Sequence, residues 1–456
     1  MKSSTITKFS FIKVCVLCVC SLTSLFAVSQ EISWSSYQSI SSGADGYGRP
    51  RICLTQNNHP FIIWTKDNSP KTINASRWDG NSFTFPYSIL PNGLDPAGGW
   101  QAPEIASNLD TIYIIFVSTA ITNNAIFLIR SFDGGVSFSD TIRVSDDSNI
   151  NRYNLPNITI NDSGHPIVTY MEYELNWHNP RQIVKVSNDY GSTFNFPVNG
   201  SDLSPGEPCD CWRADIVSVG DDVYLLYRNN DVNIRDSYIS HSSDGGLTFS
   251  SFVDIDFVSW NFPNCPSSTP RAVISGDSLI VARRSGAINN INEMYLSAVN
   301  RFDLQLTYNN VIDPLGFGLQ DYPELAGSED TIGIVWQDNR SGVIDCYFSH
   351  TFLGASSLNG SVKLTDSNSL GNQTDPDIAY SKNVFYFVYI DNNSHEIIFV
   401  TASLASNTSS TNIQDVESRR LLEIRNILGE VSLPISNVPL KYIYDNGYVE
   451  KKIILE

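Results

Sequence analysis

Three eight-residue stretches of the chain share one pattern: SFDGGVSF at 131–138, SNDYGSTF at 187–194 and SSDGGLTF at 242–249. Their aspartates lie 56 and 55 residues apart, and a degenerate fourth copy is present at 76–83. In each stretch the Ser, Thr and Asp oxygens can accept hydrogen bonds from nearby backbone N–H groups, and the Gly can adopt a positive φ. A hairpin turn that recurs at a fixed period predicts a fold built from repeated units.

A second marker recurs with the same period and shows how many units there are. It consists of a Pro, one variable residue and an aliphatic residue that opens a short strand. The marker occurs, at intervals of 53 to 58 residues, at 50–52, 103–105, 156–158, 323–325 and 376–378, with variants at 214–216 and 270–272. The sequence therefore contains seven units.

Between these markers the chain carries the signals of β-strands. Each unit has an aromatic and β-branched run, such as 61–64, 112–116 or 223–227, and further short strands flank the Asp-Gly turn. Four strands per unit predict an all-β fold, a β-propeller whose sheets close into a ring. The seventh unit has only three strands, whereas 32–40 is strand-like and has no unit of its own. We expect this N-terminal strand to complete the seventh blade; six blades is the alternative if one weak unit is not a blade.

The two ends of the chain differ from the repeated part. Three lysines precede the apolar run 14–26, and small residues follow it, which is typical of a secretory signal peptide over 1–29. The predicted propeller covers 30–403, a linker rich in Ser, Thr and Asn covers 404–418, and a small separate β-unit covers 419–456. No later stretch is apolar over the roughly 18 residues of a membrane span. We expect a secreted or cell-surface protein.

The composition excludes several classes of protein. Asp and Glu number 48 against 29 Lys and Arg, which gives a net charge of -19. A protein that binds nucleic-acid phosphates would work against this charge. The 11% aromatic and 17% charged content is also unlike that of disordered chains and coiled coils. We expect no nucleic-acid partner, no membrane span and a monomer.

The repeated turns resemble the Asp boxes of sialidase-type propellers. A longer stretch, with CDCW at 209–212, YRNN at 227–230 and the turn at 242–249, resembles secreted bacterial Asp-box propellers described as exo-sialidase-like. The C-terminal unit, with PLKYIY at 439–444 and EKK at 450–452, is similar to sorting domains that direct cargo through the type IX secretion machinery. A cap packed on the propeller is the alternative for this unit. The resemblance implies an exported propeller with a glycan or glycoprotein ligand.

The topology of a propeller predicts where that ligand binds. In a four-stranded meander the Asp boxes share one face of the disc with the turns between the first and second strands. The opposite face carries the residues before each first strand and after each second strand, and loops at such a central mouth commonly bind ligands. These positions are rich in arginine and aromatic residues: Arg49, Lys66, Asp67, Trp100, Glu104, Tyr153, Glu172, Trp212, Arg213, Arg228, Arg283, Arg284, Tyr322, Glu324, Asp338, Arg340 and Asp377.

The resemblance also implies roles for some of these residues. Sialidases hold the substrate carboxylate with three arginines, whose planar forks match a carboxylate. The predicted substrate-binding residues are Arg49, Arg51, Arg213, Arg228, Arg284 and Trp212. Where sialidases open the first blade with Arg-Ile-Pro, this chain has RPRI at 49–52. The alternative is that arginines such as Arg228 tie adjacent blades through hydrogen bonds to loop carbonyls.

The same resemblance implies the catalytic groups. Sialidases attack with a Tyr that a Glu activates and use an Asp as the acid. Here Tyr322 is the predicted nucleophile and Asp67 the predicted acid, while Glu324 is a neighbour of Tyr322 along the same strand.

Five cysteines remain after the signal peptide. Cys209 and Cys211 precede the first strand of the fourth blade, and Cys265 occupies the corresponding loop of the fifth, so the three should be neighbours. In an oxidising compartment we expect a disulfide from Cys265 to one of the other two. A soft-metal site of three thiolates is the alternative. We predict no metal and no cofactor.

Two functions from different classes follow. The first is an exo-acting glycosidase for an acidic sugar such as sialic acid, and the second is a non-catalytic propeller that binds glycan or protein at the same mouth. A polysaccharide lyase for a uronic acid polymer is a third option, although the mouth positions include no His to act as a base.

Overall fold

A computed structural model describes most of the repeated part of the chain. It covers 32–41 and 48–404, apart from 67, 69, 92, 123, 149, 267, 289, 314–317, 329, 353–357, 359 and 366–369, and then 421–426, 431–433, 440–444 and 449–452. The predicted signal peptide lies outside the described residues, as does the predicted linker except for its first residue. None of the helices among the described residues has the length and apolar character needed to cross a membrane.

Seven antiparallel sheets follow one another along the chain, five with four strands and two with a fifth short strand, which confirms the predicted all-β propeller of seven blades. The first three sheets contain β3 (Arg51–Leu54), β4 (Pro60–Lys66), β5 (Thr72–Arg77) and β6 (Tyr87–Ser88); β7 (Glu104–Asn108), β8 (Thr111–Ser118), β9 (Ala125–Ser131) and β10 (Ile142–Arg143); β11 (Asn151–Ile160), β12 (Pro166–Glu174), β13 (Arg181–Val186) and β14 (Val198–Asn199). The next three contain β16 (Asp215–Val219), β17 (Asp222–Asn230), β18 (Ser237–Ser242) and β19 (Ser251–Asp254), with β15 (Glu207–Pro208) added beside β17; β20 (Arg271–Ser275), β21 (Ser278–Ser285), β22 (Glu293–Asn300) and β23 (Leu306–Val311); β24 (Gln320–Gly327), β25 (Thr331–Asp338), β26 (Asp345–Phe352) and β27 (Val362–Lys363). The 3-10 helices η1 (Gln56–Asn58) and η2 (Gly99–Gln101) lie in the loops.

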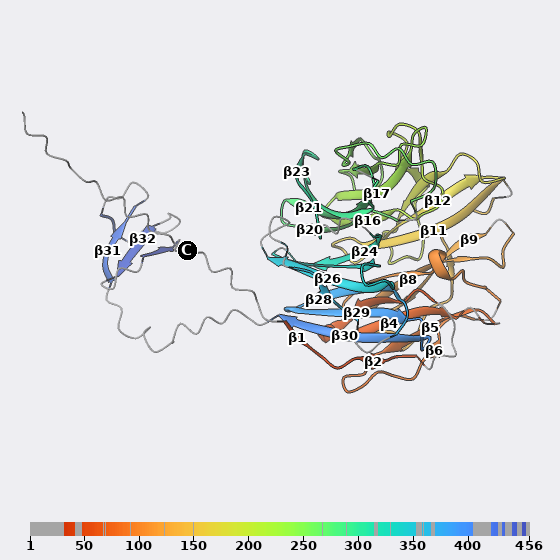
Figure 1. The fold of residues 1–456 in the computed structure, drawn as a ribbon, viewed down its shortest axis with the longest axis horizontal. Helices are drawn as coiled ribbons and strands as arrows, with labels where there is room; N and C mark the ends of the chain where they lie inside the picture. The colour runs from red at the N-terminus through yellow and green to blue at the C-terminus, as the bar shows by residue number, and fades with distance from the viewer. Residues whose placement is uncertain are drawn as a thin grey trace, which may run out of the picture.

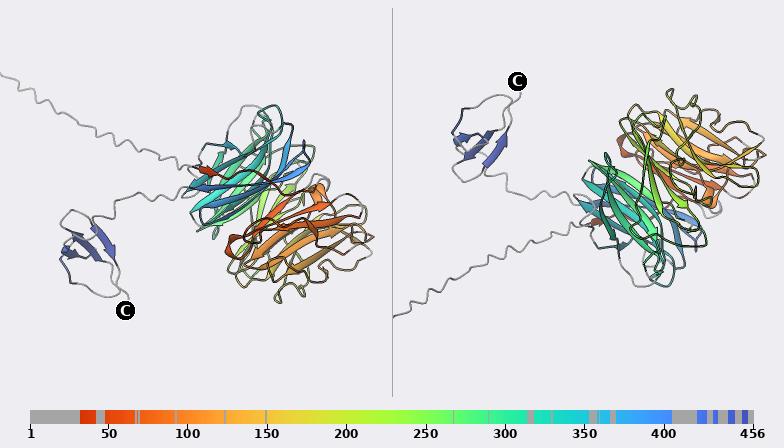
Figure 2. Two further views of the ribbon diagram at one scale, coloured as in Figure 1. Left: turned by 90° about the horizontal axis from the view of Figure 1, so that it is seen from below. Right: turned by 90° about the horizontal axis from the view of Figure 1, so that it is seen from above.

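The seventh sheet closes the ring with strands from both ends of the propeller. It contains β28 (Gln373–Ser381), β29 (Val384–Asp391), β30 (Glu396–Leu404) and the N-terminal strand β1 (Ile32–Trp34), with β2 (Gln38–Ser39) also paired to β30. The red β1 lies beside the blue β30 in Figure 1, with Ser33 paired to Ser403. The first strands contact one another in an unbroken cycle, β3, β7, β11, β16, β20, β24, β28 and β3 again. Figure 2 shows the orange and yellow sheets on one side of this ring and the cyan and blue sheets on the other.

Apolar side chains fill the spaces between neighbouring sheets. Phe61 of β4 packs in one cluster with Ile114 and Phe116 of β8, and similar clusters lie between other pairs of sheets. The second strands are apolar along most of their length because both of their faces are covered. Each large apolar side chain buried in this way contributes roughly 1.5–3 kcal/mol. The stacked sheets thus provide a rigid frame for the first strands around the centre.

The repeated turns bond locally in the way that their residue types predict. In the first of them Ser137 donates backbone N–H and side-chain O–H hydrogen bonds to Asp133, and the N–H of Gly135 donates to the hydroxyl of Ser131. The N–H of Gly134 donates to Asp110 O in the turn between β7 and β8, which places both turns on one face of the disc. These aspartates therefore have a structural role far from the opposite mouth.

We expect Gly135→Ala to destabilise the protein more than the same change at Gly245. Both glycines have a positive φ, 84° and 75°, so Ala costs roughly 1–2 kcal/mol of backbone strain at either position. A Cβ on Gly135 would lie 2.1 Å from Cε2 of Phe61, whereas none of the described atoms lies within 4 Å of a Cβ on Gly245. Overpacking should add about 1–3 kcal/mol at Gly135 alone. Urea unfolding of both variants measures the difference, and equal midpoints would contradict it.

The C-terminal residues form a separate sheet of three antiparallel strands, β31 (Leu421–Arg425), β32 (Leu440–Tyr444) and β33 (Val449–Lys452). All three strands lie within 419–456, the range of the predicted β-unit. Ile424, Leu440 and Tyr442 form a small buried cluster in this sheet. The Asp-Asn-Gly sequence at 445–447, which is typical of a hairpin turn between two strands, lies outside the described residues.

Candidate functional site

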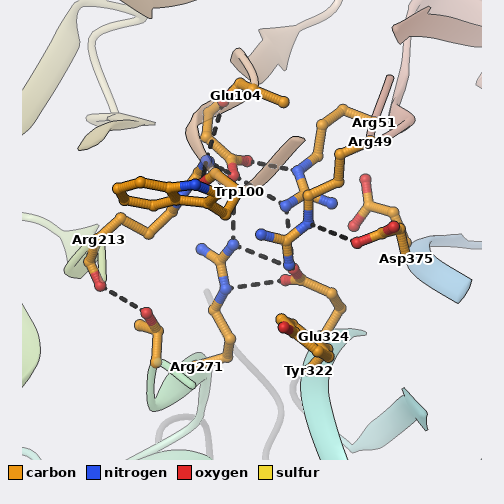
Figure 3. Close-up of polar contacts among 12 residues, drawn as sticks. Arg49, Arg51, Trp100, Glu104, Arg213, Arg271, Tyr322, Glu324 and Asp375 are labelled. Atoms are coloured by element: carbon orange, nitrogen blue, oxygen red, sulfur yellow. Dashed lines mark hydrogen bonds and ion pairs between the residues drawn. The ribbon is translucent and has the colours of Figure 1, made fainter. Parts of the chain in front are cut away.

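The variable residue of each unit marker lies in a first strand, and these seven residues meet at the centre of the propeller. Hydrogen bonds and ion pairs link them across the ring, although they come from seven different sheets. These seven residues are Arg51, Glu104, Asn157, Asp215, Arg271, Glu324 and Asp377. All seven are buried. Figure 3 shows part of this ring together with the residues next to it.

Three arginines hold the carboxylate of Glu104. Arg51 donates from Nε to Oε2 at 2.8 Å and from Nη2 to Oε1 at 2.9 Å, which forms a bidentate ion pair. Arg213 donates from Nη1 to Oε1, and Nη2 of Arg271 lies 3.3 Å from the same oxygen. The side chains of Arg51 and Arg213, both predicted to bind substrate, are at most 2% exposed. A clamp of three arginines is therefore present, but it holds a carboxylate of the protein itself (Figure 3).

Glu324 is held in a similar way. Its carboxylate lies 3.0 Å from Nε of Arg271 and 3.3 Å from guanidinium nitrogens of both Arg49 and Arg51. Burial alone would raise the pKa of Glu324, but the guanidinium charges outweigh burial and hold that pKa below its usual value. Glu324 is therefore ionised and paired. Such a group is poorly suited to take a proton from the neighbouring Tyr322.

The buried charges at the centre balance. Four arginines, Arg49, Arg51, Arg213 and Arg271, face four carboxylates, Glu104, Asp215, Glu324 and Asp377. The carboxylates of Glu324 and Asp215 outweigh the effect of burial on Arg271 and raise its pKa. Because buried charges are tolerated only when they are paired, this network occupies most of the hydrogen-bonding capacity of its members.

Asp377 gives the network a testable dependence on pH. Burial raises the pKa of Asp377 to about 6, against about 3.9 in an unfolded chain. A raised pKa means that the folded state binds the proton more tightly, so this contribution to stability is present below about pH 4 and is lost as pH rises through about 6. We expect Asp377→Asn, which can still accept the hydrogen bond from the N–H of Ile52, to gain up to about 3 kcal/mol relative to wild type between pH 4 and pH 7. Urea unfolding at both pH values measures it, with exposed Asp221→Asn as the control; a parallel shift at the two pH values would contradict the prediction.

Three of the first strands carry a bulge at the mouth end. The register shifts between Asp321 and Glu324 in β24, and equivalent shifts occur in β11 and β28. In each bulge the residue before the Pro has a positive φ: 54° for Leu155, 53° for Tyr322 and 52° for Asp375. Residues before a Pro normally avoid such conformations, so the surrounding sheet must hold them there. Bulges of this kind aim side chains next to sites, and here they place Tyr322 and Asp375 at the mouth.

Aromatic side chains gather above the buried network. Trp212 stacks on Trp100 with ring centroids 6.3 Å apart and contacts Tyr322 at 5.4 Å. We call these three residues the aromatic patch. Trp100 is 45% exposed and Tyr322 is half-buried, whereas Trp212 is only 8% exposed. The patch therefore offers two accessible rings, and the predicted substrate-binding residue Trp212 supports them from behind.

Arg49 lies beneath the aromatic patch. Its guanidinium carbon is 5.6 Å from the centroids of both Trp212 and Tyr322. Arg49 is 3% exposed, and burial, aided by the charge of Arg51, lowers its pKa to about 10. Its Nη2 donates to Glu324, but Nε and Nη1 have no hydrogen-bond partner among the described residues, although Asp375 is an ion-pair neighbour at 3.6 Å. Arg49 is thus the central arginine with the most unused hydrogen-bonding capacity (Figure 3).

Arg228 and Arg284, which were also predicted to bind substrate, lie apart from the central network. They belong to another group of buried side chains, which we call the second cluster. Arg228 donates to the backbone carbonyls of Ser268, Arg235 and Arg284 at 2.6–3.1 Å. Arg284 pairs with Asp321 at 2.6 Å, and both guanidinium groups lie over Trp260. Arg228 thus makes the carbonyl contacts of the structural alternative, and this cluster joins the fourth, fifth and sixth sheets.

The three neighbouring cysteines form one disulfide and one thiol. Cys211 is bonded to Cys265, and Cys209 is a buried free thiol. The three sulfur atoms lie within 4.8 Å of one another, which is compact enough for a metal only when the disulfide is open.

The structure brings together only part of the predicted site. Arg49, Arg51, Arg213 and Glu324 share one network, Tyr322 and Trp212 lie above it, and Arg228 and Arg284 lie in a different cluster. Asp67, the predicted acid, lies outside the described residues. Arg271, Asp215 and Asp375 were not among the predicted residues, although two of them occupy the variable position of a unit marker. Comparing the variable position of the marker across all seven units would have identified Arg271 and Asp215.

Solved structures share the fold at low sequence identity. No protein-family model matches the chain, and no curated protein does. An ulvan lyase, solved with a ligand of glucuronic acid and sulfated rhamnose, is 11% identical, with a TM-score of 0.54 over 79% of this chain and 95% of its own. A protein of unknown function from Dyadobacter fermentans is 11% identical, with a TM-score of 0.47 and coverage of 82% and 99%. A sialidase of Trypanosoma rangeli is 12% identical, with a TM-score of 0.45 and coverage of 81% and 58%. The likeness to the ulvan lyase shows a shared propeller fold.

Proposed function

We propose that this protein is an exported propeller that binds the acidic sugars of glycans at its central mouth. One observation carries the proposal: Arg49 is almost fully buried beneath aromatic rings and has two donors without a hydrogen-bond partner in the part of the chain that the structure describes. Leaving a charged donor buried and unsatisfied is costly, so such a group calls for an explanation, and a bound ligand would supply the missing partner. A carboxylate on a sugar would accept from Arg49, while Trp100 and Tyr322 offer apolar faces to the sugar ring.

The chemistry of the surroundings favours an acidic sugar over a neutral one. The other central arginines direct most of their donors to the protein's own carboxylates, whereas Arg49, which lies against Trp212 and Tyr322, has two donors without a hydrogen-bond partner among the described residues. Because Arg49 is covered in the free protein, entry of a carboxylate requires a side chain of the mouth to turn aside, and Tyr322 is half-buried and makes no hydrogen bond through its hydroxyl among the described residues. The ulvan lyase with the same fold has a glucuronic acid in its ligand, which supports this class of ligand.

Calorimetric titration tests the proposal. The protein is titrated with oligosaccharides ending in sialic or glucuronic acid and with the same oligosaccharides after reduction of the carboxylate to an alcohol. We expect the acidic sugars to bind at least about tenfold more tightly, which corresponds to the roughly 1.5–3 kcal/mol of a hydrogen bond to a charged group. Trp100→Ala should weaken both series. Equal affinity for the acidic and reduced sugars, or binding of neither, would refute the proposal.

Hydrolysis by sialidase-like chemistry is the second candidate. The bulge before Pro323 holds Tyr322 in an unusual backbone conformation at the mouth, as expected for a nucleophile. However, burial and the charge of Asp321 raise the pKa of Tyr322, and Glu324 is occupied by arginines. Release of dye from a fluorogenic sialoside tests turnover. Loss of release in Tyr322→Phe with unchanged binding would favour an enzyme, and binding without release would favour the binding module.

The proposal includes export. The features of 1–29 and 419–456 support secretion through a signal peptide and a type IX machinery, with the protein acting outside the cell as a monomer. N-terminal sequencing of the secreted protein should begin at Gln30.

A further inference from the structure

A third sulfur atom lies beside the only disulfide found among the described residues. Sγ of Cys209 is 3.0 Å from Sγ of Cys211 and 3.7 Å from Sγ of Cys265, the two atoms that form the bridge. A thiolate next to a disulfide is the reactant of thiol–disulfide exchange. Because Sγ of Cys209 lies nearer to Cys211 than to Cys265, the three sulfur atoms are not in line for attack on Cys265, and the Cys209 side chain must turn first. None of this depends on what the mouth binds.

The surroundings of Cys209 allow its thiolate to form. Nη1 of Arg235 donates to Sγ of Cys209 at 3.5 Å, and Arg228 and Arg235 both favour the charged form. Burial, however, raises the pKa of Cys209, and the charge of Asp210 acts in the same direction. The thiolate is therefore a minority species, and exchange at this site should be slower than at an exposed cysteine.

We propose that Cys209, Cys211 and Cys265 form one exchange site, in which the disulfide moves between Cys211–Cys265 and Cys209–Cys265. The Cys209 thiolate attacks Sγ of Cys265, the Cys211–Cys265 bond breaks, and Cys211 leaves as a thiolate that takes up the proton lost by Cys209. One S–S bond forms and one breaks, so no oxidant or reductant is consumed.

The two bridges differ in what they tie to the fourth sheet. The backbone N–H of Cys209 donates to Arg228 O of β17 at 2.7 Å, so Cys209 is fixed to that sheet. Cys211 directly precedes Trp212 of the aromatic patch and Arg213, which holds Glu104. Moving the bridge to Cys209 keeps the loop of Cys265 attached to the sheet but releases the segment that carries Trp212. The exchange thus changes the support of the mouth without opening the propeller.

Differential alkylation tests the proposal. Folded protein is held at pH 8, quenched with acid, unfolded and alkylated, and the labelled cysteines are identified by peptide mass spectrometry. We expect the alkylating reagent to label Cys209 in most wild-type molecules and Cys211 in at least about 1% of them. The Cys211–Cys265 bridge is then at most about a hundredfold more populated than the Cys209–Cys265 bridge. Label at Cys209 alone, with Cys211 never labelled, would overturn the proposal.

Two single variants provide an independent test of the reach of Cys209. Refolded in a glutathione redox buffer, Cys211→Ser should form the Cys209–Cys265 bridge, and Cys209→Ser should form Cys211–Cys265. The double variant Cys209→Ser with Cys211→Ser supplies the reference for a free Cys265, and circular dichroism confirms that each variant is folded. A folded Cys211→Ser in which Cys209 and Cys265 both remain free would also overturn the proposal.

Discussion

Replacing Glu104 with Gln is expected to lower the free energy of unfolding by about 3–5 kcal/mol. The substitution keeps the shape of the side chain but removes the negative charge that Arg51, Arg213 and Arg271 share. All three guanidinium groups are at most 8% exposed, so water cannot replace the lost carboxylate. Breaking one partner of a buried ion network costs far more than the pair itself contributes, because charge is left uncompensated. Urea unfolding followed by tryptophan fluorescence measures the loss.

Two further variants show whether the loss at Glu104 comes from charge. Glu174→Gln removes a charge from an exposed position and should change the stability by less than about 0.5 kcal/mol. Combining Glu104→Gln with Arg213→Met restores the charge balance and should recover part of the loss. A loss below about 1 kcal/mol in Glu104→Gln, or no recovery in the double variant, would show that the network does not depend on Glu104 in this way.

Replacing Arg49 with Met is expected to weaken binding of an acidic sugar at least tenfold and to leave the weaker binding of its reduced counterpart unchanged. Met keeps much of the apolar length of Arg but removes the donors Nε and Nη1, for which the described residues provide no hydrogen-bond partner. A hydrogen bond to a charged group is worth roughly 1.5–3 kcal/mol, or about one to two factors of ten in affinity. Calorimetric titration of both sugars with both proteins measures the effect.

Arg228→Met is the matched control for this experiment. Arg228 is as deeply buried as Arg49, but its donors are satisfied by backbone carbonyls in a different cluster. We expect it to lower stability while the folded protein keeps its preference for the acidic sugar. If Arg228→Met abolished the preference and Arg49→Met did not, the ligand carboxylate would have to be placed in the second cluster.

The repeated architecture could be predicted because its signals are local. A turn such as 131–138 makes its hydrogen bonds within eight residues, and the first-strand marker occupies three. Counting them gave seven units, and the missing strand of the seventh implied closure by the N-terminal strand, which β1 and β30 confirm. The sequence predicted that Cys265 bonds to Cys209 or Cys211 but did not decide between them, because these two cysteines are only two residues apart in the same loop.

The roles of the arginines could not be predicted, because their partners are distant in sequence. Arg213 and Glu104 are 109 residues apart, Arg271 and Glu104 167, and Arg49 and Glu324 275. Which arginine meets a carboxylate depends on the register of seven sheets at once. Family resemblance grouped Arg228 and Arg284 with Arg49, whereas the structure separates them by their partners.

The sequence by itself determined the number of sheets, their order and the face of the turns, because short-range turns and alternating strands repeat along the chain. Only the tertiary structure decided which arginine pairs with which carboxylate at the centre. Ring closure brings four buried arginines together with carboxylates from other sheets, and this pairing leaves Nε and Nη1 of Arg49 without a hydrogen-bond partner among the described residues. The arginines and carboxylates pair in this way because they are buried, and a buried charge is tolerated only beside an opposite charge.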